Sequence, residues 1–245
     1  MRVLVKTDVG KARDLNEDSY YVPQEDDDLK LFIVADGMGG YNGGEIASSL
    51  AIKAAKNYIE TNFISTPKDR ESILELIKSS MQYANMVVYE KSKEDDELKG
   101  MGTTLEICFI YENKMYIGHI GDSRIYRIRK HIIRKLTNDH SYVETLVKDG
   151  KITREEAKTH PRRNHITRAI GTDEMVIVDI FRKKLKPHDK ILMATDGLTG
   201  YVLDDKIKEL LKKDEDLDVV TKNLINFANE VSGKDNTSVI LIEQS

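Results

Sequence analysis

The chain has 245 residues, of which 40% are hydrophobic and 33% charged, values typical of a globular protein with one large or two small domains. Its net charge of -4 gives no attraction for nucleic acid or for an anionic membrane, so we expect neither as a partner. The single cysteine, Cys108, excludes an intramolecular disulfide and a thiolate metal cluster. No apolar run is long enough to span a bilayer and no signal-peptide core follows Met1, so the sequence predicts a cytoplasmic protein.

Short runs rich in β-branched and aromatic residues predict strands through most of the chain. The predicted strands are residues 2–7, 19–22, 30–35, 103–111, 114–120, 123–129, 131–136, 175–181, 189–195 and 237–243. Very short links, such as Glu112-Asn113 and Arg129-Lys130, make hairpins, so we expect mostly antiparallel pairing. Cys108 lies inside one of these runs, which indicates a buried thiol.

Two blocks of helical periodicity interrupt the strands. The first predicts a helix over 44–61 and another over 66–91, the latter beginning with Thr66 as N-cap and Pro67 in the first turn. The buried face of helix 44–61 would carry Ile46, Leu50, Ala51, Ala54 and Tyr58. The second block lies between residues 207 and 231. Together these elements predict an α+β fold, a β-sandwich of two mostly antiparallel sheets flanked by pairs of helices in four αββα layers.

Residues 138–171 break the strand rhythm with a short amphipathic piece, an Asp-Gly turn, and a cluster of arginines and histidines. Insertions of this length are usually functional or mobile. We therefore expect a single domain over residues 1–245, with a flap subdomain at about 138–171 inserted between strands.

Acidic residues recur at the ends of the predicted strands. They are Glu17 and Asp18 before an early strand, Asp36 and Asp196 after apolar runs and before glycines, Asp122 between two strands, and Asp235 before the last one. One acidic residue in such a place is most often part of a turn. Several of them on strands that lie side by side would instead converge on one rim of the fold.

Converging carboxylates repel one another, so a cation must balance them. Without a thiolate cluster or a His-x-x-x-His pair, zinc is a poor candidate, and oxygen ligands favour Mg²⁺ or Mn²⁺, with Ca²⁺ an alternative. Gly37 has no side chain, so its carbonyl can approach an ion closely. Arg13 could grip a phosphate, although a surface ion pair with Asp14 or Glu17 is an equal alternative.

Eight motifs in one order make the chain resemble the metal-dependent protein serine/threonine phosphatases of the PP2C (PPM) family, in their compact bacterial form. They are RDLNEDSY, VADGMGGYNGGEIAS, GMGTTL, IGDSRIYR, LTNDHS, HPRRNHITRAIG, LMATDGLTG and KDNTSVILI, and they extend over essentially the whole chain. The resemblance implies hydrolysis of phosphoserine and phosphothreonine in proteins by a metal-activated water, without a phosphoenzyme. It also implies phosphorylated proteins as partners, and a bacterial serine/threonine kinase whose signalling the enzyme reverses. We expect a monomer.

The resemblance further implies a role for each residue at the rim. Asp36 would bridge two metal ions, with the carbonyl of Gly37 as a ligand, and Arg13 would bind the substrate phosphate. Asp196 and Asp235 would complete the first ion's ligands, Glu17 would hold the second ion, and Asp122 with Asp196 would hold a third. Asp18 and Asn236 would support these ligands from behind. The expected cofactors are therefore at least two Mn²⁺ or Mg²⁺ ions, and a third.

The chain departs from the family at the expected proton donor. Where members carry histidine after the Asp-Gly or after the next Gly-Gly, this chain has Met38 and Tyr41. Tyr41, a metal-bound water, His140 and His160 are the alternatives, and a structural role is the better interpretation of both histidines. The departure at Tyr41 leaves open a catalytically silent regulator that binds phosphoproteins, and an enzyme for small phosphate esters is a further alternative.

Overall fold

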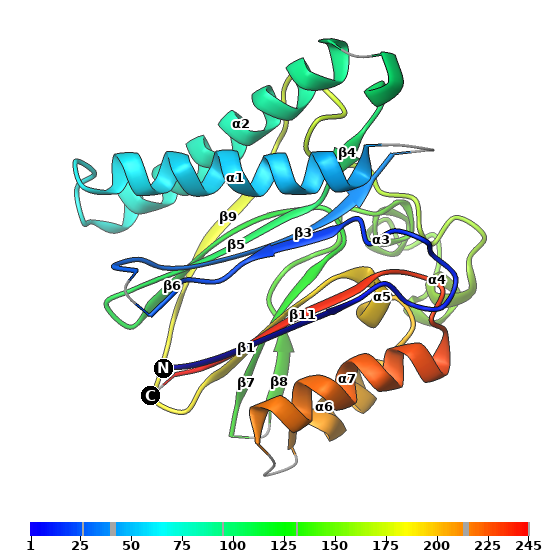
Figure 1. The fold of residues 1–245 in the computed structure, drawn as a ribbon. Coiled ribbons are helices and arrows are strands. Elements are labelled where there is room, and N and C mark those ends of the chain that lie inside the picture. The colour runs from blue at the N-terminus through cyan, green and yellow to red at the C-terminus, as the bar shows by residue number, and fades with distance from the viewer. Residues whose placement is uncertain (26, 40–42, 95, 131, 213–215, 245) are drawn as a thin grey trace.

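The computed structural model describes residues 1–25, 27–39, 43–94, 96–130, 132–212 and 216–244. In this part of the chain, two antiparallel sheets pack face to face, and helices cover both outer faces (Figure 1). The predicted four-layer α+β sandwich is therefore confirmed. The two chain ends lie side by side at one end of it (Figure 1).

The first sheet has five strands in the order β1-β11-β10-β7-β8, and every neighbouring pair is antiparallel. Its strands are β1 (Arg2–Asp8), β7 (Arg124–Arg129), β8 (Ile132–Lys135), β10 (Lys190–Ala194) and β11 (Thr237–Glu243). The central strand β10 thus lies between β11 and β7, which are far apart in the sequence. This order joins the last strand of the chain to the first.

The second sheet follows the order β2-β3-β5-β6-β9, also antiparallel throughout, with the two-residue β4 added to β3. Its strands are β2 (Asp18–Tyr21), β3 (Lys30–Met38), β4 (Gly102–Thr103), β5 (Leu105–Tyr111), β6 (Lys114–Ile120) and β9 (Asp179–Lys184). Glu112 and Asn113 have φ values of 47° and 55°, so the predicted hairpin between β5 and β6 turns through two left-handed residues.

Helices α1 (Gly44–Phe63) and α2 (Arg70–Glu94) cover the second sheet, and α6 (Asp204–Lys212) and α7 (Leu217–Val231) cover the first (Figure 1). Three short helices, α3 (Tyr142–Lys148), α4 (Arg154–Thr159) and α5 (Asp196–Thr199), gather at the end of the sandwich where β3 ends (Figure 1). A single 3-10 turn, Asp96–Leu98, precedes β4. None of the helices in the described ranges combines the length and apolar character needed to cross a membrane.

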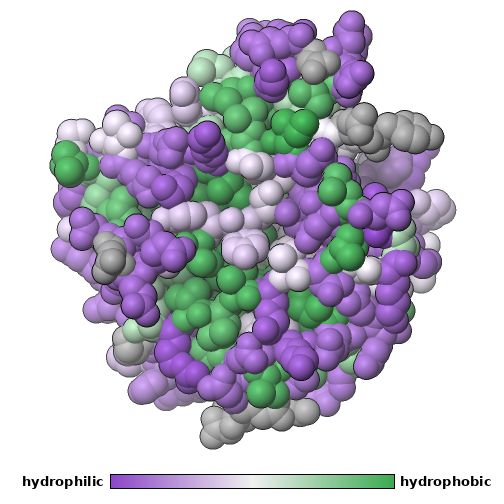
Figure 2. Space-filling model, viewed as in Figure 1, coloured by the Kyte–Doolittle hydropathy of each residue, from purple (hydrophilic) through white to green (hydrophobic). Residues whose placement is uncertain are grey.

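Three apolar clusters hold the layers together. One lies under α1 and α2, one under α6 and α7, and the third fills the space between the sheets, where Phe32, Cys108 and Ile240 are fully buried. Apolar groups of this middle band reach the surface between the two sheets (Figure 2). Burial raises the pKa of the Cys108 thiol, as expected for an inert core residue.

Three local expectations were wrong. The helix expected over 66–91 begins at Arg70, because the carboxylate of Asp69 accepts hydrogen bonds from the Ser72 N–H and hydroxyl, as an N-cap residue does. The strand expected over 175–181 begins at Asp179 and leaves Ile177 74% exposed. On helix α1, Ala51 and Ala54 are buried and Leu50 and Tyr58 pack on the core as expected, but Ile46 is 38% exposed, while Ala47 and Ile59 are fully buried.

The layer between the sheets gives a test of the fold. Ile240 is fully buried in this layer. Ile240→Ala should lower the free energy of unfolding by about 2–5 kcal/mol, because it leaves a cavity that cannot collapse between the two sheets. Val231→Ala, at a half-exposed position of α7, is the control and should stay within about 0.5 kcal/mol of the parent. Urea unfolding measures both, and equal effects would contradict this account of the core.

Candidate metal centre

The registers of the two sheets bring the acidic strand ends to one rim. Asp18 of β2 pairs directly with Asp36 of β3. In the other sheet, Ala194 of β10 pairs with Arg124 of β7 and with Val239 of β11. Strands aligned in this way end together, so the residues just beyond these pairs lie at the same rim as Asp18 and Asp36. Those residues are Asp122, Asp196 and Asp235.

Asp36 and Asp196 interact with each other at this rim. The backbone of Asp36 is fixed by the threonines beside it: its N–H donates to Thr104 Oγ1 (2.9 Å) and its carbonyl accepts from Thr103 Oγ1 (2.9 Å). Burial, and then the charges of Asp18 and Asp196, raise the pKa of Asp36 well above its usual range. Burial and the neighbouring Asp235 raise the pKa of Asp196 to about 6, while a hydrogen bond from Asp36 opposes that rise. The two carboxyl groups thus influence each other's pKa.

Asp18 and Asp122 each carry a buried carboxylate oxygen without a hydrogen-bond partner among the described residues, Oδ1 in both cases. The other oxygen of Asp18 accepts from Thr195 Oγ1 at 2.9 Å, and burial raises the pKa of this carboxyl to about 7. Burial, followed by the charge of Asp196, raises the pKa of Asp122 well above its usual range. Unpaired buried oxygens are costly, and they face the same rim as the Asp36–Asp196 pair.

Arg13 provides the positive charge at this rim. Its guanidinium contacts Asp235 Oδ1 at 2.9 Å and Glu17 Oε2 at 3.9 Å, and the side chain is 47% exposed. The ion pair with Glu17 considered from the sequence is therefore present, and a second one with Asp235 accompanies it. Burial raises the pKa of Glu17, and the charge of Arg13 opposes this rise. Arg13 thus lies where it offsets the repulsion between carboxylates.

Glycines allow the backbone to close around this rim. A Cβ on Gly37 would collide with the carbonyl oxygens of Gly44 and Glu17, and one on Gly197 would collide with the carbonyl of Asn236. Neither Asp-Gly pair is a simple turn. Asp36 and Gly37 continue β3, which ends only at Met38, and Asp196 and Gly197 begin α5. The glycines serve close backbone approach rather than chain reversal.

Asn236 ties the N-terminal loop to the start of β11. Its Nδ2 donates to the carbonyls of Val9 and Leu15, both at 2.9 Å, and its Oδ1 accepts from the backbone N–H of Glu17 at 2.8 Å. One buried side chain therefore fixes the segment that carries Arg13 and Glu17.

The structure thus brings Arg13, Glu17, Asp18, Asp36, Gly37, Asp122, Asp196, Asp235 and Asn236 to one end of the sandwich. Within the described ranges, however, no group of three or more His, Cys, Asp or Glu side chains could by itself hold an ion as the side chains now lie. Repulsion explains the spread: Asp235 turns to Arg13 and Asp18 turns to Thr195. Which of these residues bind a metal therefore stays a prediction.

A buried network behind Asp122 was not predicted from the sequence. His119 Nδ1 lies 3.0 Å from Glu106 Oε1, both side chains are fully buried, and the His119 ring lies 4.6 Å from that of His140. The backbone of Gly121 exchanges two hydrogen bonds with His140. Glu106 lies in β5, His119 in β6 and His140 in a loop. A single charged residue in such a place is usually exposed to solvent, so the sequence pattern does not indicate a buried pair.

Residues 138–171 are anchored at both ends next to this network. The Thr167 N–H donates to the carbonyl of His140 at 2.7 Å, and Thr103 and Ile170 form an antiparallel bridge. Between these anchors lie α3 and α4, each with a side-chain N-cap, Ser141 and Thr153.

The side chains considered as proton donors are Tyr41, His140 and His160. Tyr41 lies outside the described residues. Burial, with the charges of His119 and Arg168, lowers the pKa of His140 to about 4, so its ring is neutral near pH 7. The structural role expected for His140 agrees with its contacts. His160 accepts from the Arg162 N–H and packs near Tyr142 at the end of α4.

Comparison with known proteins decides the family. The family model described as protein phosphatase 2C matches residues 11–239. The chain belongs to the protein phosphatase 2C family. The serine/threonine phosphatase stp of Listeria monocytogenes is 36% identical over 245 residues, which cover 100% of this chain and 96% of the relative. The solved serine/threonine phosphatase Stp1 of Staphylococcus aureus matches with a TM-score of 0.92 and 36% identity, over 99% of this chain and 94% of that one.

A further solved structure bears on the metal. The catalytic domain of the serine/threonine protein phosphatase PstP, in complex with two manganese ions, matches with a TM-score of 0.85 and 31% identity, over 100% of this chain and 98% of that one. The family resemblance predicted from the eight motifs is confirmed, and so is the class of enzyme, a protein serine/threonine phosphatase.

The contacts of Asn236 give a test of how the rim is built. Asn236→Ala should lower the free energy of unfolding by about 1–3 kcal/mol, because it leaves the Glu17 N–H and two backbone carbonyls without their partner. Asn226→Ala, at an exposed position of α7, is the control and should change stability by less than about 0.5 kcal/mol. Chemical unfolding of the metal-free protein measures the difference, and an Asn236 variant as stable as the control would contradict the anchoring role.

Proposed function

We propose that this protein uses divalent metal ions to hydrolyse phosphoserine and phosphothreonine in proteins, and that the rim described above is its active site. The observation that carries the proposal is the convergence of acidic side chains from both sheets on one rim, where Arg13 pairs with Glu17 and Asp235, in a chain of the protein phosphatase 2C family. Buried carboxylates with raised pKa values in one place are more common at functional sites than in ordinary cores.

The donor set fits a hard divalent cation. Every candidate ligand is an oxygen, and two buried carboxylate oxygens, of Asp18 and Asp122, have no partner among the described residues. We assign the ligand roles to Glu17, Asp36, the carbonyl of Gly37, Asp122, Asp196 and Asp235, with Asp18 and Asn236 behind them. The number of ions, at least two with a third at Asp122 and Asp196, and their identity as Mn²⁺ or Mg²⁺, belong to this proposal.

When bound, the ions supply an activated water and neutralise charge on the phosphoryl group. The protein's own contribution is mostly positioning. Thr103 and Thr104 hold the backbone of Asp36, and Asn236 holds that of Glu17. Arg13 now pairs with Asp235 and Glu17, and cations on those carboxylates would release its half-exposed guanidinium to grip two phosphate oxygens. Arg13 therefore has one partner set without substrate and another with it.

The wider setting of the enzyme is part of the same proposal. We assign residues 1–245 to one domain and residues 138–171 to a flap that borders the active site, because the flap's two anchors lie beside Asp122 and Asp36. A monomer in the cytoplasm that opposes a serine/threonine kinase is the setting we predict. His140 is not the general acid near pH 7, because its ring is already neutral there and a neutral imidazole is a very weak acid.

Substitution of Asp36 and of Asp196 tests the proposal. Asp36→Asn and Asp196→Ala should each reduce Mn²⁺-dependent hydrolysis of a phosphothreonine peptide by more than about 100-fold, because each removes a ligand that the reaction needs. Neither should destabilise the metal-free protein, because each also removes repulsion between buried carboxylates. Asp205→Asn, on the exposed surface of α6, is the charge-matched control and should keep full activity.

Thermal unfolding with and without Mn²⁺ adds a readout independent of activity. The ion should raise the midpoint temperature of unfolding of the parent and of the control, and should raise that of Asp36→Asn much less. Full activity in both rim variants would contradict the assignment. Folded protein that does not hydrolyse p-nitrophenyl phosphate with Mn²⁺, yet binds phosphopeptide, would favour the silent regulator. A kcat/KM far higher for small phosphate esters than for phosphopeptides would favour the third alternative.

A further inference from the structure

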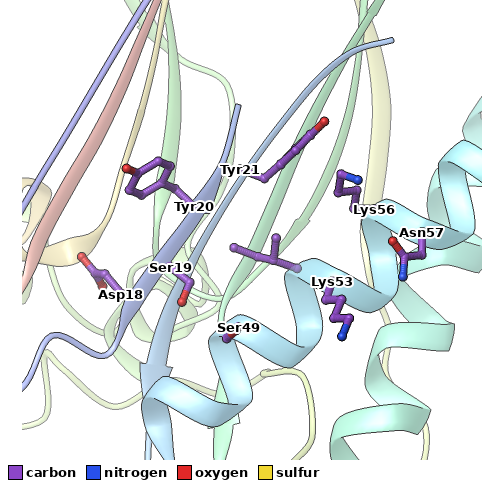
Figure 3. Close-up of a pocket in the computed structure, with 9 residues that line it drawn as sticks. Asp18, Ser19, Tyr20, Tyr21, Ser49, Lys53, Lys56 and Asn57 are labelled. Carbon is purple, nitrogen blue, oxygen red and sulfur yellow. The ribbon is translucent and has the colours of Figure 1, made fainter. Parts of the chain in front are cut away.

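A groove of about 560 Å³ runs between the edge strand β2 and helix α1 (Figure 3). Strand β2 contributes Asp18 to Tyr21, and the helix contributes Ser49, Lys53, Lys56 and others. Tyr20 and Tyr21 point to opposite sides of the strand, Tyr21 toward Lys56 of the helix (Figure 3). Apart from its first residue, Asp18, this groove has no part in the proposed metal centre.

One end of the groove adjoins the proposed active site. The Ser48 hydroxyl donates to the carbonyl of Glu17 at 2.7 Å and lies 2.9 Å from the hydroxyl of Ser19, so α1 and β2 meet here. From Ser49 the helix carries the groove away from this end. At about 1.5 Å of rise per residue, Lys53 lies about 6 Å and Lys56 about 10 Å further along. An extended peptide covers these distances in about two to three residues.

The lining of the groove is cationic. Lys53 is exposed and forms no ion pair within the described part of the chain. Lys56 pairs with Glu60 at 2.8 Å and lies 5.0 Å from the centre of the Tyr21 ring. Among the nine lining residues the only carboxylate is that of Asp18, which is turned toward Thr195. Two acidic neighbours lie at the far end, where Glu60 pairs with Lys56 and Asp27 accepts from the Tyr21 hydroxyl at 2.8 Å. The positive charge that the groove offers to an anion is therefore that of Lys53.

Among the described residues, strand β2 is the terminal strand of its sheet and pairs on one side only, with β3. The Gly37 N–H donates to the carbonyl of Glu17, so by alternation Ser19 and Tyr21 bond to β3 and Tyr20 directs its backbone groups outward. The side chain of Tyr20 is 43% exposed. Extended peptides commonly bind by adding to such an edge, with charged side chains read by groups on either side.

We propose that the β2–α1 groove binds an extended acidic segment of the phosphoprotein substrate, on one side of the phosphorylated residue and within about five positions of it. The backbone of the segment follows β2, and its carboxylates meet Lys53. The inference rests on the proposed function and adds to it a substrate preference that the metal centre cannot provide, since that centre reads only the phosphate.

Matched phosphothreonine peptides test this groove. One pair differs only in Asp or Asn at positions roughly two to five residues N-terminal to the phosphothreonine, and a second pair carries the same difference on the C-terminal side. The acidic peptide of one pair should have the higher kcat/KM, by about two- to tenfold, because exposed ion pairs contribute modestly. The other pair should show no difference. Raising the salt to about 1 M should remove the preference.

Charge reversal at the groove gives the decisive variant. In Lys53→Glu, the kcat/KM values for the acidic and the neutral peptide should become equal. The variant should also hydrolyse a peptide with Lys in the same places faster than the neutral one. A merely structural defect cannot produce this inversion of preference. Lys222→Glu, at an exposed position of α7 on the opposite layer, makes the same change in net charge and should keep the parental ratio. An unchanged ratio in Lys53→Glu, an equal loss in Lys222→Glu, or a preference on both sides of the phosphothreonine would overturn the proposal.

The two proposals fail separately. If both peptides of each pair are hydrolysed equally well, the phosphatase assignment stands and the groove proposal falls. If no peptide is hydrolysed with Mn²⁺, the catalytic proposal falls, and fluorescence anisotropy of the acidic and neutral phosphopeptides with parent and Lys53→Glu protein still decides whether the groove binds an acidic chain.

Discussion

The structure depends on holding several carboxylates close together at one end of a β-sandwich. Burial and mutual repulsion raise the pKa values of Asp36, Asp122 and Asp196, so the metal-free rim stores unfavourable electrostatic energy. The charges of Arg13 and Arg124 offset part of it. A rim built in this way is less stable than a neutral one, and the fold tolerates it because the strands behind it are fixed by packing and not by the acidic groups themselves.

That fixing comes from both sheets at once. Asp18 and Asp36 belong to the second sheet, while Asp196 and Asp235 lie at strand ends of the first, so the geometry of the rim is set by how the sheets pack on each other. Thr195 joins them directly: its hydroxyl donates to Asp18 and accepts from the Ser238 N–H. Because close-packed interiors do not deform continuously, an error in the middle layer, such as a cavity at Ile240, would be expected to displace ligands as well as lower stability.

The fold could be predicted from the sequence because apolar runs, short links and helical periodicity each carry a local signal. The rim residues could be predicted because they interrupt those runs. Features that depend on a distant contact, or on a pattern that fits two structures, could not be predicted. Thr66 and Asp69 are both residue types that cap helices, so the sequence allows two starts for α2, and the apolar residues Met175 and Ile177 are exposed although they alternate like a strand. The Glu106–His119 pair was missed because its two members are 13 positions apart on paired strands, and only that pairing places both in the interior.

The rim is bordered by two surfaces of different construction. On one side, residues 138–171 are tied through His140 to Gly121 and through Ile170 to Thr103, so any movement of this segment is coupled to the backbone beside Asp122 and Asp36. On the other side, β2 and α1 are joined to the rim by Ser48, through packed regular structure with little freedom to move. A rigid groove can add binding energy without an ordering cost, whereas a segment attached at its two ends loses conformational entropy when it closes. The groove is therefore better suited to select substrates by the sequence that flanks the phosphorylated residue. Residues 138–171 are better suited to adjust access to the metal centre.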